Sequence, residues 1–204
     1  MPRKTKEEAQ ATRGRILDAA ERLFQARGVS RTSLHDIAAA AGVTRGAVYW
    51  HFHDKGDLFN AMLERVFLPM EERKLALVHA GPGEVLPAVR ALLLDILGLL
   101  VRDEQARRVA EIVTQRMEFV EEMSKVRERR QQVRREFQGQ LERALRHGQQ
   151  SGEVVAAPGA RQLALGLLAL LDGLIHNWLF DPDHDLRRVG AKAFDVHLAG
   201  LRRR

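Results

Sequence analysis

The sequence predicts an all-α protein with an N-terminal three-helix helix-turn-helix domain and a larger helical domain after it. Apolar residues recur at spacings of three and four over most of the 204 residues, which is the pattern of helices with one buried face. No segment alternates apolar and polar residues between turn signals, as strands do. The chain also has no internal repeats or low-complexity tracts, so a repeat architecture is not indicated.

The first helix is expected from about Lys6 to Ala26, with Gly28 as its stop signal. Its apolar side consists of Ile16, Leu17, Ala20, Leu23 and Phe24. The residues before it are basic, with Arg3 and Lys4 ahead of Lys6. Two interpretations of this terminus stay open, a flexible arm that reaches a DNA groove or a solvated end.

Two short helices are expected between Thr32 and Phe52. The first carries an apolar stripe at helical spacing and is followed by Gly42, which supplies the turn. Thr44 can then cap a second helix, Arg45 to His51, through its hydroxyl. The stripe of the first helix consists of Leu34, Ile37, Ala38 and Ala41. This arrangement is a helix-turn-helix.

The second helix of the pair has the composition of a DNA-reading helix. It concentrates side chains that can donate hydrogen bonds, and Gly46 leaves its start without bulk, so that the free amides can approach a phosphate or a base edge. We expect Arg45 to contact a base edge. The remaining DNA-binding candidates are Ser33, Thr44, Gly46, Tyr49, Trp50, His51 and Lys55. The structural alternative is a pair of helices whose polar residues are only solvated.

A fourth helix is expected to open at Asp54–Asp57 and to carry Leu58, Met62 and Val66 at helical spacing. Lys55 lies at its start, where the helix dipole disfavours a cation, so we expect an external anion such as a DNA phosphate as its partner. Pro69 should kink or end the helix. A linker is expected at residues 80–83.

Apolar periodicity in the remaining chain predicts five further helices. We expect them at residues 87–101, 103–118, 121–146, 161–180 and 186–201, with a loop between His147 and Gly159. One face of the helix at 121–146 is rich in arginine, which indicates a solvated face more simply than a second nucleic-acid surface. The helix at 161–180 is apolar on every side, so a partner subunit is the economical way to bury it.

Asp172 interrupts that apolar helix. A carboxylate in apolar surroundings needs compensation, so it either bonds a neighbouring polar side chain or awaits a donor from a ligand.

Composition limits the function classes. The net charge of +6 favours a polyanionic partner, and the absence of cysteine excludes disulfides and thiolate metal sites. The N-terminus is too polar for a signal peptide, and the longest apolar run, Leu163–Leu171, is about half of the roughly 20 residues that a membrane span needs. We expect a cytoplasmic protein with no membrane association.

Enzyme signatures are absent from the sequence. There is no GxSxG elbow, phosphate-binding glycine loop, zinc-ligand helix or cysteine nucleophile, and no cofactor is expected. His51 and His53 would diverge on a helix, which argues against a metal site. Glu111, Glu118 and Asp172 could form an acid/base set, but surroundings rich in Leu, Met and Val suit binding better than hydrolysis.

The segment GVTRGAVYWHFHDKGDLF resembles the recognition segment of TetR-type transcriptional repressors. The segments TKEEAQATRGRILDAAERLF and DGLIHNWLFDP resemble the multidrug-efflux repressors of that family, those of the AcrR and TtgR type. The resemblance implies that the fourth helix connects the DNA-binding part to the effector-binding part and carries the switch. It also implies that the last two helices of each subunit form a four-helix dimer interface.

These observations predict a DNA-binding domain at residues 1–56 and an effector-binding and dimerisation domain at residues 57–204. We expect a homodimeric repressor that binds a palindromic double-stranded operator and is released by a hydrophobic small molecule, controlling a multidrug efflux operon. The candidate ligand-lining residues are Met62, Val66, Leu93, Ile96, Glu111, Thr114, Gln115, Glu118, Leu168, Asp172, Ile175 and His176. The alternatives are a TetR-type regulator of a metabolic operon induced by an acyl or aromatic metabolite and, more distantly, a helical enzyme or carrier.

Overall fold

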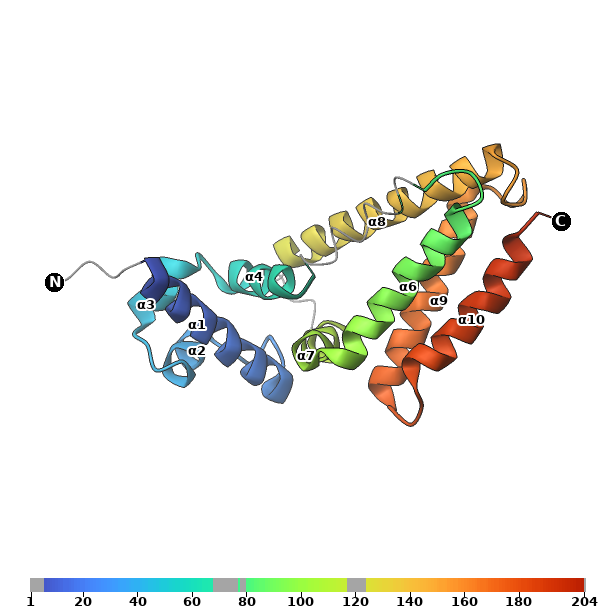
Figure 1. Ribbon diagram of the computed structural model, residues 1–204. Helices are drawn as coiled ribbons and strands as arrows, with labels where there is room; N and C mark the ends of the chain where they lie inside the picture. The colour runs from blue at the N-terminus through green and yellow to red at the C-terminus, as the bar shows by residue number, and fades with distance from the viewer. Residues whose placement is uncertain (1–5, 68–76, 78–79, 117–123, 204) are drawn as a thin grey trace. The chain divides into compact units, whose positions relative to one another are not determined.

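The computed structural model describes residues 6–67, 77, 80–116 and 124–203, and its described residues are mainly helical (Figure 1). No strand occurs among them, although Val154 and Arg202 form an isolated antiparallel bridge. The elements are α1 (Lys6–Arg27), α2 (Leu34–Ala40), α3 (Arg45–His51), α4 (Lys55–Phe67), α6 (Val85–Arg102), α7 (Glu104–Glu111), the π-turn η2 (Ile112–Arg116), α8 (Ser124–Gln150), α9 (Ala160–Phe180) and α10 (Leu186–Leu201). The all-α prediction is confirmed. Four residues used in the sequence argument lie outside the described residues: Arg3, Lys4, Pro69 and Glu118.

The chain divides into two compact units. The first comprises Met1–Val66 and Arg108–Arg130, and the second comprises Phe67–Arg107 and Gln131–Arg204. The helix-turn-helix therefore shares a unit with a segment that is distant from it in sequence. The boundary after residue 56 stays a prediction about separate functional domains.

The core of the first unit forms between α1 and α4. Phe24 of α1 and Phe59 of α4 are fully buried, and their ring centroids lie 5.8 Å apart. Ile16, Leu58 and Met62 are also completely buried, as their helical spacing predicts. Gly28 ends α1 with a φ of +85°, which a side chain with a Cβ would disfavour.

The helix expected at residues 103–118 differs from the prediction, because it changes type after Glu111. Helix α7 continues as the π-turn η2. The Thr114 hydroxyl donates a hydrogen bond of 2.8 Å to the Ala110 carbonyl, the acceptor that the Thr114 amide would use in an α-helix. This competition for one carbonyl is a local reason for the wider turn, which periodicity alone does not reveal.

Helices α6, α9 and α10 lie side by side in the second unit (Figure 1). Helix α10 approaches α6 closely at Gly190, which is buried. A Cβ at this position would overlap Cδ1 of Leu97 in α6, and Leu97 is itself fully buried. The glycine is therefore required by the packing of the two helices and not by the backbone conformation.

The loop expected from His147 begins later than predicted, because α8 continues to Gln150. Gly148 is buried inside the helix, and a Cβ there would lie 2.6 Å from Cγ2 of Val154. The turn is made instead by Gly152, which has a φ of +80°. Gly148 was wrongly assigned to the loop, because a glycine that permits close packing has the same sequence signal as one that ends a helix.

A carboxylate from the α8–α9 loop caps α6. Glu153 accepts hydrogen bonds from the amides of Val85 and Leu86 at 3.1 and 2.8 Å, and its own carbonyl accepts the Arg203 amide at 3.0 Å. A negative charge at a helix N-terminus satisfies free amides and interacts favourably with the helix dipole. Glu153 thus joins the start of α6 to the end of the described chain.

Helix α9 leaves much of its apolar surface uncovered. By length and composition α9 could cross a bilayer, which the short uninterrupted run Leu163–Leu171 did not predict, and only 33% of its most apolar window is buried. Leu165 of α9 is 43% exposed, while Val189 and Val196 of α10 are 38% and 77% exposed. An apolar face of this kind on two neighbouring helices needs a covering surface.

The close approach of α10 to α6 predicts that Gly190→Ala destabilises the protein by about 1–3 kcal/mol, through overpacking against Leu97. Thermal or urea unfolding would measure the change. Gly200→Ala is the matched control on the same helix, because no atom lies within 4 Å of its added Cβ, so it should be neutral or stabilise by up to about 1 kcal/mol. Equal stability of the two variants would contradict the proposed packing constraint.

Candidate nucleic-acid interface

Helix α2 begins at a complete capping box. The Ser33 hydroxyl accepts the Asp36 amide at 3.1 Å, and the Asp36 carboxylate accepts the Ser33 amide at 2.9 Å. The same carboxylate accepts the Ser33 hydroxyl proton at 2.6 Å, and these bonds hold the pKa of Asp36 below its ordinary value. Ser33 was predicted as a phosphate contact, and its side chain has a structural role at this cap.

The turn between α2 and α3 has the predicted chemistry. Gly42 adopts a φ of +64°, and the amide of Val43 donates to the Ala38 carbonyl at 3.0 Å. Thr44 then caps α3, because its hydroxyl accepts the Ala47 amide at 3.2 Å. The positive φ at Gly42 and the threonine cap fix the direction in which α3 leaves the turn.

Helix α3 has one anchored face and one open face. Val48 and the following Phe52 are 0% and 2% exposed, so they hold the helix on its unit. On the other side, Tyr49 is 47% exposed and Trp50 is 73% exposed. Because large apolar side chains favour burial, two such rings on a short helix mark a surface suited to a partner.

Arg45 and Tyr49 form a pair on the open face. The Arg45 guanidinium lies 5.4 Å from the Tyr49 ring centroid, and its Nη2 lies 3.4 Å from the Tyr49 hydroxyl. A guanidinium held by cation–π contact loses less freedom when it binds a base or phosphate. His51 is half-buried, and its ring meets the Trp50 ring edge-on with centroids 4.5 Å apart.

A groove of about 470 Å³ lies beside this face. It brings together four of the predicted residues, Ser33, Arg45, Tyr49 and Lys55. The other residues that line it are Ser30, Arg31, Thr32, Leu34, His35 and Asp36. Arg31 and His35 were not predicted from the sequence. A basic residue before the cap and another in the first turn of α2 were the available signals.

The other predicted residues lie on α3 or at its cap and do not line the groove. Gly46 is exposed, and the nearest atom to an added Cβ would be the Thr44 hydroxyl at 3.9 Å. The fold therefore does not require a glycine here, and its lack of a side chain leaves room for the close approach that the sequence predicts. Among the described residues, no group of three His, Asp or Glu side chains could hold a metal ion.

The reasoning that led to Lys55 is corrected by the structure. Lys55 is only 5% exposed, and its ammonium donates a hydrogen bond to the Thr32 carbonyl at 3.2 Å. The cation thus has a partner inside the protein, so its place at a helix N-terminus does not imply an external anion. Sequence reasoning missed this contact because the acceptor is a backbone carbonyl more than twenty residues away.

The predicted ligand residues of the first unit have mixed surroundings. Met62 and Val66 of α4 are buried core residues. Glu111 accepts a hydrogen bond from Gln25 at 2.8 Å. Thr114 bonds the backbone within η2, as described above, and Gln115 is exposed.

In the second unit, Leu93 and Leu168 are buried, Ile96 and Ile175 are half-buried, and His176 is exposed. Asp172 pairs with Arg134 of α8 at 2.7 Å, and its side chain is 49% exposed. Of the two alternatives for Asp172, this contact supports the neighbouring polar side chain. Because the side chain is half exposed and ion-paired, Asp172 is not enclosed by apolar residues alone.

One polar atom suited to a ligand was not predicted. The side-chain oxygen of Gln140 in α8 is buried and has no hydrogen-bond partner among the described residues. A buried acceptor of this kind costs free energy unless a donor reaches it. The available signal was a glutamine within the apolar stripe of α8, between Phe137 and Leu141.

Family comparisons divide the chain in two. Residues 16–62 match the family of bacterial regulatory proteins described as the tetR family. Residues 84–201 match the C-terminal region of MAATS-type transcriptional repressors.

Relatives and solved structures match almost the whole chain. The HTH-type transcriptional regulator TtgR of Pseudomonas putida is 40% identical over 203 residues, covering 99% of this chain and 97% of the relative. The regulator AcrR of Shigella flexneri is 41% identical, covering 92% and 88%. NalD, the secondary repressor of the MexAB-OprM multidrug efflux pump in Pseudomonas aeruginosa, has a TM-score of 0.89 at 38% identity, covering 97% and 99%. A complex of SmeT with triclosan has a TM-score of 0.83 at 36% identity, covering 95% and 93%.

The different surroundings of Lys55 and Arg45 predict different effects of their removal. Lys55→Met should lower stability by about 1–3 kcal/mol, because the Thr32 carbonyl loses its donor. It should not change the salt dependence of DNA binding, whereas loss of a phosphate contact would reduce the slope by about 0.9. Arg45→Ala should cost about 1–3 kcal/mol of binding and relax base preference, with little change in stability.

Both variants would be compared on a duplex selected from a random-sequence pool and on random duplex, at several salt concentrations, beside thermal unfolding. A reduced salt slope for Lys55→Met would show that Lys55 contacts a DNA phosphate after all. Equal losses of Arg45→Ala on the two duplexes would refute base readout.

Proposed function

The chain belongs to the tetR family of bacterial regulatory proteins, and from this premise we propose that it is a ligand-responsive repressor that binds a palindromic operator as a homodimer. The family establishes that it is a DNA-binding transcriptional repressor and not an enzyme. The proposal adds that hydrophobic small molecules release it from DNA and that it controls a multidrug efflux operon. We place it in the cytoplasm, where its DNA target lies, and assign it no cofactor.

The open face of α3 carries the proposal of operator binding. Arg45 and Tyr49 are paired beside a groove, while Val48 and Phe52 anchor the opposite face. This division of one short helix into an anchored face and a polar, aromatic face suits entry into the major groove. Two such helices related by a two-fold axis would read two half-sites one helical turn apart, and so a palindrome.

The uncovered apolar surface of α9 and α10 supports the proposed dimer. Leu165, Val189 and Val196 are exposed on these two helices, and Phe180 at the end of α9 is 81% exposed. A second copy of the same surface would bury these side chains in an isologous interface. The same burial would explain why α9 is apolar enough for a membrane without requiring one.

Named relatives support the efflux assignment. NalD is described as a repressor of a multidrug efflux pump, and SmeT as the repressor of the Stenotrophomonas maltophilia multidrug efflux pump SmeDEF. The likeness to the fatty acid degradation regulator FadR, at 20% identity, shows the fold alone. We therefore favour a hydrophobic drug-like inducer over an acyl metabolite, with the buried oxygen of Gln140 as an added candidate acceptor.

The dimer surface predicts that Val196→Arg converts the protein to a monomer, because a charge in the centre of an apolar interface would remain unpaired. Analytical ultracentrifugation would measure the mass, and operator affinity should fall with it. Val133→Arg is the matched control, since Val133 is also an exposed valine, 40% accessible, but lies on α8. A Val196→Arg protein that remains dimeric would contradict the proposed interface.

The proposed release by a ligand can be tested with triclosan as the probe. We expect triclosan to weaken binding to the selected duplex about 5- to 150-fold, and the duplex to weaken triclosan binding by the same factor. Calorimetric titration with and without duplex would measure both. Triclosan binding that is unaffected by the duplex would contradict release by this ligand, and failure to select any duplex would contradict operator binding.

A further inference from the structure

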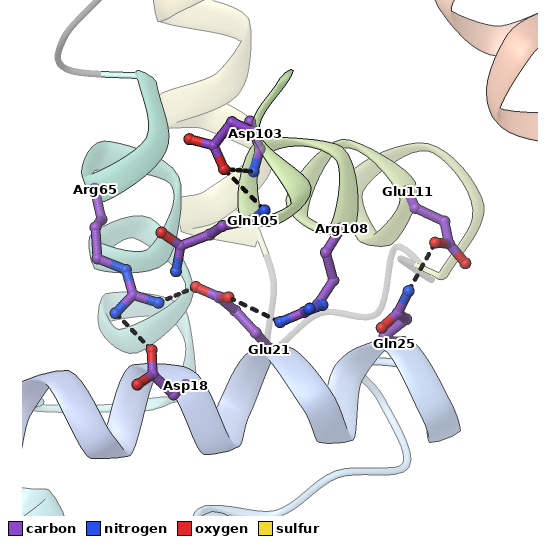
Figure 2. A network of polar contacts seen from close by, with 9 residues as sticks. Asp18, Glu21, Gln25, Arg65, Asp103, Gln105, Arg108 and Glu111 are labelled. Atoms are coloured by element: carbon purple, nitrogen blue, oxygen red, sulfur yellow. Dashed lines mark hydrogen bonds and ion pairs between the residues drawn. The ribbon is translucent and has the colours of Figure 1, made fainter. Parts of the chain in front are cut away.

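Glu21 of α1 is a charged residue in the interior of the first unit. Its exposed fraction is 0%, and its carboxylate lies between two arginines from other elements, Arg65 of α4 and Arg108 of α7 (Figure 2). Arg65 pairs with one carboxylate oxygen, and Nη1 of Arg108 lies 3.9 Å from the other. A buried carboxylate needs such cations, because removing its hydration without compensation costs several kcal/mol.

Two further contacts join α1 to the same distant segment. The Gln25 amide donates to the Glu111 carboxylate at 2.8 Å (Figure 2). The Val29 amide, just beyond the end of α1, donates to the Arg116 carbonyl at 3.2 Å. Glu21 and Gln25 lie one turn apart on α1, and Val29 follows the end of this helix, after Gly28 with its φ of +85°.

The residues that Glu21, Gln25 and Val29 contact in this segment are spaced three and then five residues apart. The step from Arg108 to Glu111 follows α7, and the step from Glu111 to Arg116 spans the π-turn η2. A π-turn takes more residues than an α-turn to complete one revolution, so it brings the Arg116 carbonyl to the side of η2 that contacts the end of α1 and Val29. The unusual helix type therefore has a consequence for the contact with Val29.

The last contact lies next to the groove of the DNA interface. Val29 is fully buried and begins the corner that leads from α1 into α2. Within this corner the Thr32 hydroxyl donates to the Gly28 carbonyl at 2.9 Å, and the Thr32 carbonyl accepts the Lys55 ammonium. Ser33, which caps α2, follows directly. Displacement at Val29 would thus be passed to the capped start of the helix-turn-helix.

We propose that the segment Arg108–Arg116, termed the brace, positions the helix-turn-helix for operator binding, with Arg108 as its anchoring positioning residue. The inference rests on the proposed operator binding, and it adds a role for residues that do not face the DNA. The brace is continuous with the start of α7, whose first residues belong to the second unit.

The experiment compares Arg108→Met with Arg107→Met in the full chain. The two substitutions remove the same charge from adjacent residues of α7, but Arg107 is exposed, whereas Arg108 contacts Glu21. Amide hydrogen exchange of Val29 to Thr32 in the DNA-free protein is the first measurement. Affinity for the duplex selected by the wild-type protein, at several salt concentrations, is the second, and thermal unfolding is recorded for each variant.

We expect Arg108→Met to speed exchange at Val29 to Thr32 by about 10-fold or more, through easier local opening. Operator affinity should fall about 5-fold or more, as for a typical coupling between separate sites. The salt slope should stay unchanged, because no phosphate contact is lost. Arg108→Lys should restore part of both effects, and Arg107→Met should resemble the wild type.

The proposal is overturned if exchange at the corner is unchanged in Arg108→Met, whether or not DNA binds. It is also overturned if affinity falls only together with a reduced salt slope, which would make Arg108 a direct DNA contact. If Arg108→Met does not fold, Gln25→Met, which removes only the contact with Glu111, must show the same exchange pattern. Failure of the wild-type protein to select a duplex would refute the proposed operator binding. The amide exchange at Val29 to Thr32 would still decide whether the brace stabilises the α1–α2 corner.

Discussion

The buried carboxylate of Glu21 is the constraint on which the first unit depends. A carboxylate without hydration needs compensating cations, and the two arginines that contact it come from α4 and from α7. One charge therefore fixes three elements that are far apart in the chain. The Phe24–Phe59 contact supplies apolar burial beside it, but burial has no preferred direction, whereas the ion pairs require particular side chains at particular places.

The same unit separates structural polar groups from those that are open to a partner. Ser33, Thr44 and Lys55 make their hydrogen bonds within the protein, on two helix caps and one loop carbonyl. Arg45, Tyr49 and Trp50 keep their polar groups or rings on the surface of α3. The residues proposed to bind DNA and those that hold the fold are thus neighbours in one segment, and residue type alone does not distinguish the two roles.

In the second unit, close packing and exposure alternate along single helices. Helix α10 meets α6 at Gly190, where only a hydrogen atom fits, and it presents Val189 and Val196 on its open surface. The residues that hold the helix in its own subunit and those proposed to hold a second subunit therefore lie within two turns of each other. The helices at the end of the chain thus carry apolar side chains that their own unit leaves exposed.

The sequence by itself determined the features that depend on residues close together in the chain. The all-α class, the cap at Thr44, the turns at Gly28 and Gly42 and the bounds of α10 follow from interactions within about four residues. Only the tertiary structure decided the partner of Lys55, the ion pair of Asp172, the packing role of Gly148 and the contact of η2 with the α1–α2 corner. The physical reason is that each of these depends on a group from a distant part of the chain, whose arrival is set by the packing of whole helices and leaves no local signal.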